Sequence, residues 1–174
     1  DQMHNIMSQA ETPIKVFSML YKPIHNDPDE NQSSLINTIE TICNSVETFA
    51  RVNGGIVVIS DLDVCKNHAP ISMILLISAI NQRLIEAGLR FNVSVIVQTG
   101  QISSSHHIAC ALGFGASAVY PLSVLLRAEE KFSKDAKNAY MNFTKASEKA
   151  LMKTMGKVGL CTVESYSGGE FFEP

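Results

Sequence analysis

Two short runs of β-branched residues constrain the fold of this chain most strongly. Residues 56–59 read Ile-Val-Val-Ile and residues 93–97 read Val-Ser-Val-Ile-Val. An uninterrupted apolar run is typical of a parallel strand that is buried on both faces, whereas a strand with one wet face alternates apolar and polar residues. Helical periodicity fills the residues between the two runs. The pattern predicts an α/β fold with a parallel sheet, alternating helices and right-handed crossovers.

The remaining segments extend this alternation on both sides. Residues 14–21 alternate like a strand, residues 27–30 form a polar loop, and Ser33 or Ser34 is expected to cap a helix whose apolar stripe ends before Gly54. The triplet at residues 103–105 is an expected N-cap for a helix over residues 106–112. The other expected helices cover residues 71–87, 121–127 and 134–155, and the other expected strands cover residues 116–120 and 160–166.

Composition limits the classes of function. A chain of 174 residues with 45% hydrophobic residues and a net charge of −3 fits one folded domain without a basic surface for nucleic acid. Its most apolar stretch is too short to span a membrane, and no signal peptide opens it. The four cysteines are scattered singly, which argues against a zinc site or a disulfide framework and favours a cytoplasmic location. The missing initiator methionine predicts a piece of a longer polypeptide.

Candidate site residues follow the expected strands, because loops at the carboxyl ends of parallel strands form the binding face of such sheets. Asp61 and Asp63 are either paired acid–base or cation-binding carboxylates or, as we favour, loop-capping carboxylates that bond to loop backbone. His106 and His107 start a helix, where neighbouring side chains diverge, so a structural role is favoured over a shared metal ion.

Two glycine features could be read as phosphate sites. Gly113 and Gly115 lie after a helix and before a strand, which is the reverse of the order that places phosphate at a helix N-terminus, so a helix stop is favoured. The loop that begins at Thr99 and Gly100 lies between a strand and a helix, and the hydroxyls of Ser103 and Ser104 follow it. Helix capping alone explains the serines, and no Lys or Arg accompanies them. An anion loop remains an alternative there.

A collinear set of motifs resembles the large subunit of glutamate synthase. Residues 149–173, KALMKTMGKVGLCTVESYSGGEFFE, look like the passage from its central domain to its flavin-binding barrel. Blocks upstream occur in the same order and spacing. They are Ala69-Pro70-Ile71, Leu84-Ile85, Gly88-Leu89-Arg90, Val97, Thr99-Gly100, His106-His107 and Gly113-Phe114-Gly115-Ala116.

The resemblance implies a fold, a set of domains and a role. It implies a rudimentary, incomplete TIM-barrel-like central domain over residues 1–150 and the truncated start of the barrel that binds flavin mononucleotide (FMN) over residues 151–174. Glutamate synthases form two glutamates from glutamine, 2-oxoglutarate and a reductant. The central domain joins the amidotransferase and FMN domains and helps enclose the ammonia route, so this piece is expected to be non-catalytic.

The resemblance also bears on cofactors and partners. FMN and an iron–sulfur cluster belong to the parent enzyme, and neither cofactor is expected in this chain. Lys157 and Ser165 are candidates for the edge of the FMN site, or they only frame the first barrel strand. The expected partners are the amidotransferase and FMN domains, with self-association possible through exposed docking surfaces. The electron donor of the parent, whether nicotinamide or ferredoxin, lies outside these residues.

The chain departs from the family pattern at several polar positions. Leu62 and Ser167 stand where arginines are usual, Gln98 replaces a glutamate, and Tyr120 replaces an asparagine. Ser103 and Ser104 replace an Arg-Glu pair, and an arginine's fork of donors is not reproduced by Leu or Ser. Either these positions hold structural pairs that were rebuilt in a divergent subgroup, or contacts with neighbouring domains differ in this chain. Two competing hypotheses also stay open beside the central domain. One is a stand-alone module that binds a phosphate-bearing ligand at residues 99–105, and the other is a barrel that becomes an active flavoenzyme only by pairing with a second chain.

Overall fold

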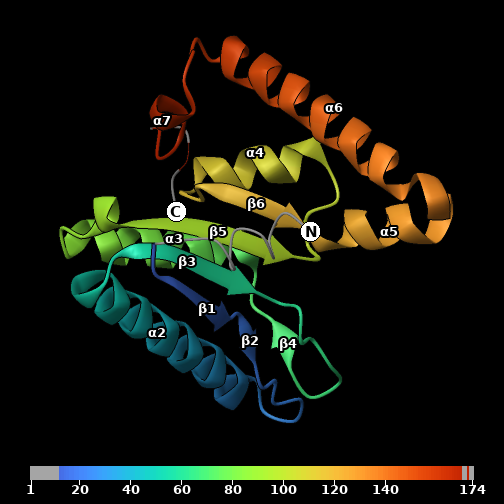
Figure 1. Cartoon of the computed structure of the whole chain (residues 1–174). Coiled ribbons are helices and arrows are strands. Elements are labelled where there is room, and N and C mark those ends of the chain that lie inside the picture. The colour runs from blue at the N-terminus through green and yellow to red at the C-terminus, as the bar shows by residue number, and fades with distance from the viewer. Residues whose placement is uncertain (1–11, 170–171, 173–174) are drawn as a thin grey trace.

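A parallel four-stranded sheet organises the computed structural model, which describes residues 12–169 and residue 172. The strand order is β1-β3-β5-β6, so the strands lie in the sheet in the same order as they occur along the chain (Figure 1). The strands are β1 (Ile14–Ser18), β3 (Gly55–Ser60), β5 (Val93–Thr99) and β6 (Ala118–Pro121). The two β-branched runs are the two central strands, as predicted. This confirms the α/β class with a parallel sheet and alternating helices.

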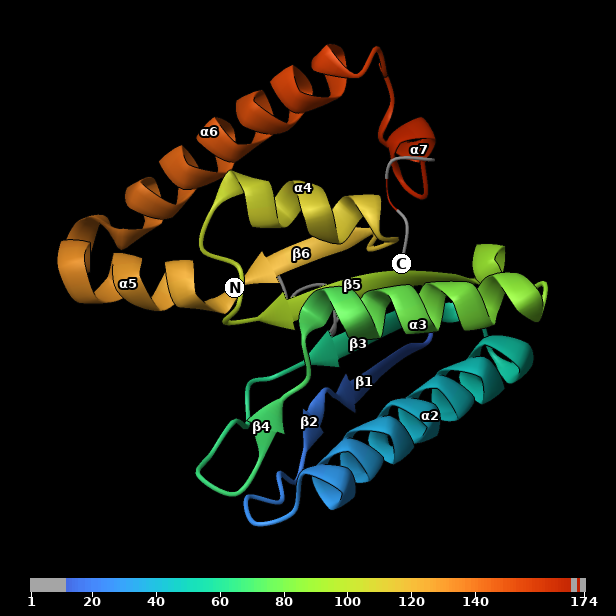
Figure 2. The same cartoon turned by 180° about the vertical axis from the view of Figure 1, so that it is seen from behind.

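Three crossover helices cover the same face of the sheet. They are α2 (Pro28–Val52), α3 (Met73–Glu86) and α4 (Ser105–Gly113), and Figure 2 shows α3 lying in front of β3 and β5. Val57 and Ile59 of β3 join residues of these helices in one buried cluster, whereas Val58 and Ile96 form a separate small cluster on the opposite face. Helices on one face of a sequentially ordered parallel sheet are the winding of a TIM barrel. The four strands described do not close into a barrel.

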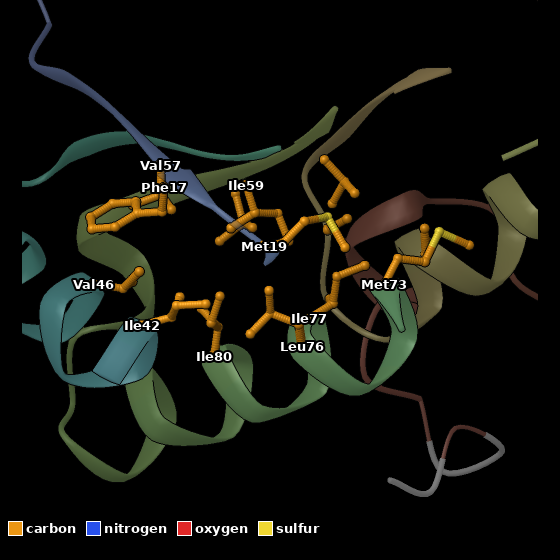
Figure 3. Packing of buried hydrophobic residues seen from close by; sticks show 14 of the residues in the cluster. Phe17, Met19, Ile42, Val46, Val57, Ile59, Met73, Leu76, Ile77 and Ile80 are labelled. Atoms are coloured by element: carbon orange, nitrogen blue, oxygen red, sulfur yellow. The ribbon is translucent and has the colours of Figure 1, made fainter. Parts of the chain in front are cut away.

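The main core lies between the sheet and the first two helices. Figure 3 shows Ile59 and Met19 facing Leu76, Ile77 and Ile80 of α3. All five of these side chains are at most 1% exposed. Phe17 packs edge-on against Phe49 of α2, with ring centroids 6.4 Å apart. The apolar stripe predicted for α2 therefore supplies one wall of the core.

The predicted strand over residues 14–21 is interrupted in the structure. β1 ends at Ser18, and β2 (Leu20–Tyr21) pairs antiparallel with β4 (Ala69–Pro70), a short strand that the sequence did not indicate. Met19 lies between β1 and β2, and its backbone forms hydrogen bonds toward both sheets. Its N–H donates to Ser60 and its carbonyl accepts from Ile71. The chain therefore changes sheets at this fully buried residue.

The start of α2 differs from the prediction. The helix begins at Pro28, and the Asp27 carboxylate caps it by accepting from the backbone N–H groups of Asp29 and Glu30, each at 3.0 Å. Proline at the first helical position and acidic residues in the first turn both suit a helix N-terminus. The expected cap at Ser33 or Ser34 was wrong. The Ser34 hydroxyl instead donates to the Lys22 carbonyl at 2.9 Å.

The C-terminal part forms a helical hairpin and a returning segment. α5 (Leu122–Phe132) and η2 (Ser133–Asp135) lead into α6 (Ala136–Lys157), which packs against α5 and runs back over α4 (Figure 1). η1 (Arg90–Asn92) precedes β5. None of the described helices is both long and apolar enough to cross a membrane. The predicted domain boundary after residue 150 falls within α6 and stays a prediction.

The strand predicted for residues 160–166 was wrong. Residues 158–162 have no regular structure, and α7 (Val163–Tyr166) is a single turn that the Thr162 hydroxyl caps. Gly159 and Gly168 have φ values of 80° and 71°, so the backbone turns on both sides of this short helix. The segment instead returns to α4. There the Gly168 N–H donates to the Gly113 carbonyl at 2.7 Å, and Phe172 packs beside Phe114 and Tyr166.

Candidate functional site at the carboxyl edge of the sheet

A buried carboxylate ties together the carboxyl ends of the two central strands. Asp61 follows β3 and is only 5% exposed. It accepts the hydroxyl of Thr99, the last residue of β5, at 2.5 Å, and the N–H of Gly100 at 3.0 Å. Hydrogen bonds to a charged acceptor are stronger than neutral ones, and an unpaired buried carboxylate would be costly. Asp61 therefore caps the loop that follows β5, which agrees with a loop-capping role for this carboxylate.

Two more polar side chains at this edge bond to one another. The Ser60 hydroxyl donates to the Gln98 side-chain carbonyl at 2.9 Å and accepts from the Leu62 N–H at 3.2 Å. The Gln98 amide serves as acceptor for Ser60 without placing a second carboxylate near Asp61. Leu62 is 62% exposed.

Gln101 extends the same network to the start of α3. Its side-chain amide donates to the Ile71 carbonyl at 2.8 Å and accepts from the Met73 N–H at 3.0 Å. Its own N–H donates to the Thr99 hydroxyl at 3.1 Å. The sequence analysis did not single out Gln101, because the backbone groups that it bridges lie far away along the chain. At this edge of the sheet, the polar side chains of Ser60, Asp61, Gln98, Thr99 and Gln101 all form hydrogen bonds within the chain.

The other predicted candidates do not converge on a reactive centre. Asp63 is exposed while Asp61 is buried, so the two carboxylates are in different environments. His107 Nδ1 accepts from the Ser103 N–H at 3.3 Å, and His106 Nε2 lies 3.6 Å from Cys110 Sγ. The two imidazole rings therefore have separate neighbours. Within the described part of the chain, no three His, Cys, Asp or Glu side chains are grouped as metal ligands.

The predicted anion loop makes its contacts within the chain. Thr99 and Gly100 both donate to Asp61, as described above. The Ser104 hydroxyl caps α4 by accepting from the His107 N–H at 3.4 Å, as predicted for this serine triplet. Ser103 is exposed and lies beside the His107 ring. The anion that the backbone of this loop binds is thus the carboxylate of Asp61, a residue of the same chain.

Lys157 and Ser165, the candidates for an FMN edge, lie at helix ends. Lys157 is exposed in the last turn of α6, where a cation complements the helix dipole. The Ser165 N–H donates to the Thr162 hydroxyl at 3.3 Å, and their side-chain oxygens are 3.0 Å apart. Ser167 ends α7 through its backbone N–H, which donates to the Val163 carbonyl. Burial, helped by Tyr140 and Glu129, raises the pKa of Tyr120.

A cavity of about 240 Å³ separates α6 from α4 and β6. Its lining is mostly apolar, from residues such as Leu112, Val119, Phe143 and Leu151, with Glu148 among the polar groups. Sites for small organic ligands usually measure roughly 300–1,000 Å³ and contain converging polar groups. This cavity is smaller than that range. It marks incomplete packing beneath α6.

The arrangement as a whole defines a class of protein. The chain is similar to solved mutants of flavocytochrome b2: one with bound benzoylformate gives a TM-score of 0.60 at 14% identity, and one with bound pyruvate gives 0.57 at 15%. Each comparison covers 96% of this chain and 36% of the flavocytochrome chain. The fold of this chain therefore resembles part of the α/β barrel of these flavocytochrome chains, and hydrogen bonds within the chain occupy its carboxyl edge.

Sequence relatives specify the family. The profile of the glutamate synthase central domain matches residues 1–174, and the chain belongs to this family. It is 32% identical over 186 residues to a ferredoxin-dependent glutamate synthase of Cyanidium caldarium, covering 97% of this chain and 12% of that protein. It is also 32% identical over 123 residues to the NADPH glutamate synthase large chain of Bacillus subtilis, covering 68% and 8%. The chain thus spans about a tenth of the length of these relatives.

Proposed function

We propose that this chain serves as the non-catalytic central domain of a glutamate synthase large chain. In that role it joins an amidotransferase domain to an FMN domain of the same polypeptide and helps enclose the route of ammonia between them. The observation that carries the proposal is the family match over all 174 residues. The reaction of the whole protein would convert glutamine, 2-oxoglutarate and a reductant into two glutamates. Its location in the cytoplasm is part of the same proposal.

The closed carboxyl edge supports a structural role. A general base or nucleophile must be free to meet a substrate, and it usually has a partner that activates it. Asp61, the most buried carboxylate of this edge, already accepts from Thr99 and Gly100. Ser60 and Gln98 bond to one another. These groups hold loops in place and leave no activated nucleophile among them.

The surroundings of Lys157 and Ser165 support the part of the proposal that assigns the flavin to another domain. Flavin phosphate is usually held by backbone N–H groups and cations, and the isoalloxazine ring needs an enclosing wall. The Ser165 N–H is engaged by Thr162, and Lys157 lies exposed at the other end of the segment that leads to α7. An iron–sulfur cluster requires grouped thiolates, whereas Cys43 is buried and Cys65 is exposed on a separate loop. The proposal therefore assigns both cofactors to other parts of the parent enzyme.

The stand-alone phosphate-binding alternative receives no support from the described residues. Its loop would need donors aimed at solvent, yet Thr99 and Gly100 donate to Asp61 and Ser104 caps α4. Lys or Arg side chains do not contribute to this network. The central-domain role is therefore the only function that we propose for this chain.

A titration with FMN tests the proposal directly. The purified chain is added to FMN while quenching of flavin fluorescence is followed. We expect no saturable change, because the groups that would hold the flavin belong to other parts of the parent. Tight stoichiometric quenching would mean that the chain completes a flavin site, and the non-catalytic assignment would then be wrong.

An activity assay tests the identity of the parent. The longer polypeptide is expected to form glutamate from glutamine and 2-oxoglutarate with NADPH or reduced ferredoxin, and the isolated chain is expected to form none. The same assay with ammonia in place of glutamine separates the synthase step from amide hydrolysis. A longer polypeptide that lacks both activities would contradict the proposed function.

A further inference from the structure

Helix α6 has two chemically different faces. Its inner face packs toward α4 and β6 with Phe143, Ser147 and Leu151, of which Ser147 is only 7% exposed. The opposite side, which we call the outer face of α6, consists of Met141, Lys145, Lys149, Met152 and Lys153. These positions recur at steps of three and four, so they share one side of the helix. All five are exposed, and Figure 2 shows α6 at the periphery of the molecule.

The positive charge of the chain is concentrated in this region. Residues 122–157 contain eight of the 14 Lys and Arg but only four of the 17 Asp and Glu. The eight cations are Arg127, Lys131, Lys134, Lys137, Lys145, Lys149, Lys153 and Lys157. The rest of the chain therefore has an excess of negative charge, although the net charge of the whole is only −3. The α5–α6 hairpin is a basic arm on an acidic body.

The lysines of the outer face have no carboxylate partners within the described residues. The ion pairs found there involve Arg51 and Arg83, which belong to α2 and α3. Like charges four residues apart on a helix repel one another and cost about 0.2–0.5 kcal/mol per pair. Lys145, Lys149 and Lys153 form two such pairs. Folding of the isolated chain gains nothing from this arrangement.

The two methionines add an apolar component to the outer face. Met141 is 43% exposed and Met152 is 61% exposed, on the side of α6 that faces away from the core. Methionine adapts to irregular partners and is over-used at binding surfaces. A face with methionines framed by lysines matches the apolar centre and charged rim of a protein interface.

We infer that the outer face of α6 is a docking surface for an acidic protein surface elsewhere in the same long polypeptide. The inference rests on the proposed function, because it assumes the multidomain parent. Relatives are about ten times longer than this chain, so most of their surface lies outside the residues described here. Opposite charges would neutralise the lysine row, and apolar atoms of the partner surface would cover the two methionines.

Polyanions of other classes fit this face less well. Recognition of phosphate favours the planar fork of arginine, whereas the three cations here are all lysines. A row of three lysines at spacings of about 6 Å along one helix matches a helix or strand that bears carboxylates. The occupant is therefore a protein segment.

Lysine acetylation with an N-hydroxysuccinimide ester, followed by mass spectrometry, tests the inference. The isolated chain and the longer polypeptide are labelled in parallel. In the longer polypeptide we expect Lys145, Lys149 and Lys153 to react about tenfold more slowly than in the isolated chain, as for a face covered about 90% of the time. Lys22 and Lys66, which are exposed and lie outside the arm, serve as internal controls and should change little.

Two variants of the longer polypeptide separate docking from folding. The triple variant K145E/K149E/K153E should raise proteolysis between domains, while its helical circular dichroism stays unchanged. The double variant K22E/K66E is the matched control for charge reversal and should behave like the parent protein. Unchanged reactivity of all three lysines in the longer polypeptide would overturn the inference. So would protection that appears only after an oligonucleotide or anionic vesicles are added.

The activity assay described above keeps this result apart from the proposed function. A longer polypeptide that forms glutamate but leaves the three lysines reactive retains the proposed function and loses the docking surface. A longer polypeptide that forms no glutamate but protects the three lysines would retain the docking surface and lose the proposed function.

Discussion

The half of the chain that contains α2 and α3 and the half that contains α5 and α6 bury very different amounts of their helices. α2 and α3 each bury five residues, and these residues are mainly aliphatic. α5 buries only Ala128, and the 22-residue α6 buries only Ser147 and Met155. Burial of apolar area supplies most of the stability of a domain. The first half is therefore the structural centre of the chain, and the second half is an arm attached to it.

The difference also separates the two kinds of surface. The exposed polar face of α2 carries hydroxyls and amides, and several of its threonines and serines bond to its own backbone carbonyls. The exposed face of α6 carries unpaired lysines and methionines. A helix that is satisfied by its own residues needs no partner, whereas the outer face of α6 gains from one. Four predictions test this contrast.

The largest effect is expected from truncation of the core beneath the sheet. Leu76→Ala removes a fully buried side chain of α3 and leaves a cavity, so the free energy of unfolding should fall by about 2–5 kcal/mol. Leu151→Ala in α6 removes the same atoms from a position that is only half-buried, and should cost only about 1 kcal/mol because less apolar area is lost from the interior. Urea denaturation of both variants measures the difference. Equal losses would show that the arm is as well packed as the core.

The hydrogen bonds at the carboxyl edge should give the next largest effect. Asp61→Asn keeps the size of the side chain but removes the charged acceptor for Thr99 and Gly100. We expect a loss of about 1–3 kcal/mol in urea denaturation. Asp63→Asn is the matched control on the same loop, and because Asp63 is exposed it should change stability by less than about 0.5 kcal/mol. A double-mutant cycle with Thr99→Val should show coupling, and additive losses would mean that the Asp61–Thr99 bond contributes nothing.

Alkaline pH should weaken the first half through Cys43. Burial is the main cause that raises the pKa of the Cys43 thiol to about 11 from 9.0, with Arg83 opposing it. Below pH 9 the thiol is neutral in both the folded and the unfolded chain, so its contribution to the free energy of unfolding does not change with pH. Between pH 9 and pH 11 the unfolded thiol ionises while the folded one stays protonated, so stability falls by about 1.4 kcal/mol per pH unit.

Comparison with Cys43→Ala isolates this contribution from those of other groups. The variant should be less stable than the parent at pH 8 because it loses packing, and the gap between the two proteins should narrow as the pH rises to 10.5. Unfolding free energies at both pH values provide the measurement. A gap that stays constant would show that the thiol titrates alike in the folded and unfolded chain.

The smallest effect concerns the helix cap that the sequence analysis misplaced. Asp27→Ala removes the acceptor for the first N–H groups of α2 and should cost about 1 kcal/mol. Ser33→Ala, at an exposed position within the helix, is the control and should be neutral within about 0.5 kcal/mol. A larger loss at Ser33 than at Asp27 would restore the original prediction and shorten α2.

Local patterns predicted the parts of the fold that depend on local chemistry. The β-branched runs became β3 and β5, the apolar stripe of α2 faces the core, and Ser104 caps α4. The class of fold and the capping role of Asp61 followed from the same patterns. The start of α2 was readable as well, since Asp27 before Pro28 is a helix-start signal that the serines obscured.

The errors arose where distant residues decide the structure. Residues 160–166 have strand-forming side chains, yet no described strand pairs with them, and the Thr162 cap with its flanking glycines turns them into α7. β4 exists only because Met19 places β2 beside it. Gln101 joins the edge network through backbone groups of α3 that lie some thirty positions earlier in the chain. Spacing along one segment contains no information on such contacts.

The sequential order of the sheet has a consequence for synthesis of the protein. Each new strand, from β1 through β3 and β5 to β6, is added at the edge of the strands already made, and none has to be inserted between two earlier ones. Domains form as the chain emerges from the ribosome, N-terminal residues first. Each strand–helix–strand unit can therefore pack on the previous one as soon as it is translated. A nascent chain paused after β5 would already hold the main core, with the arm still to come.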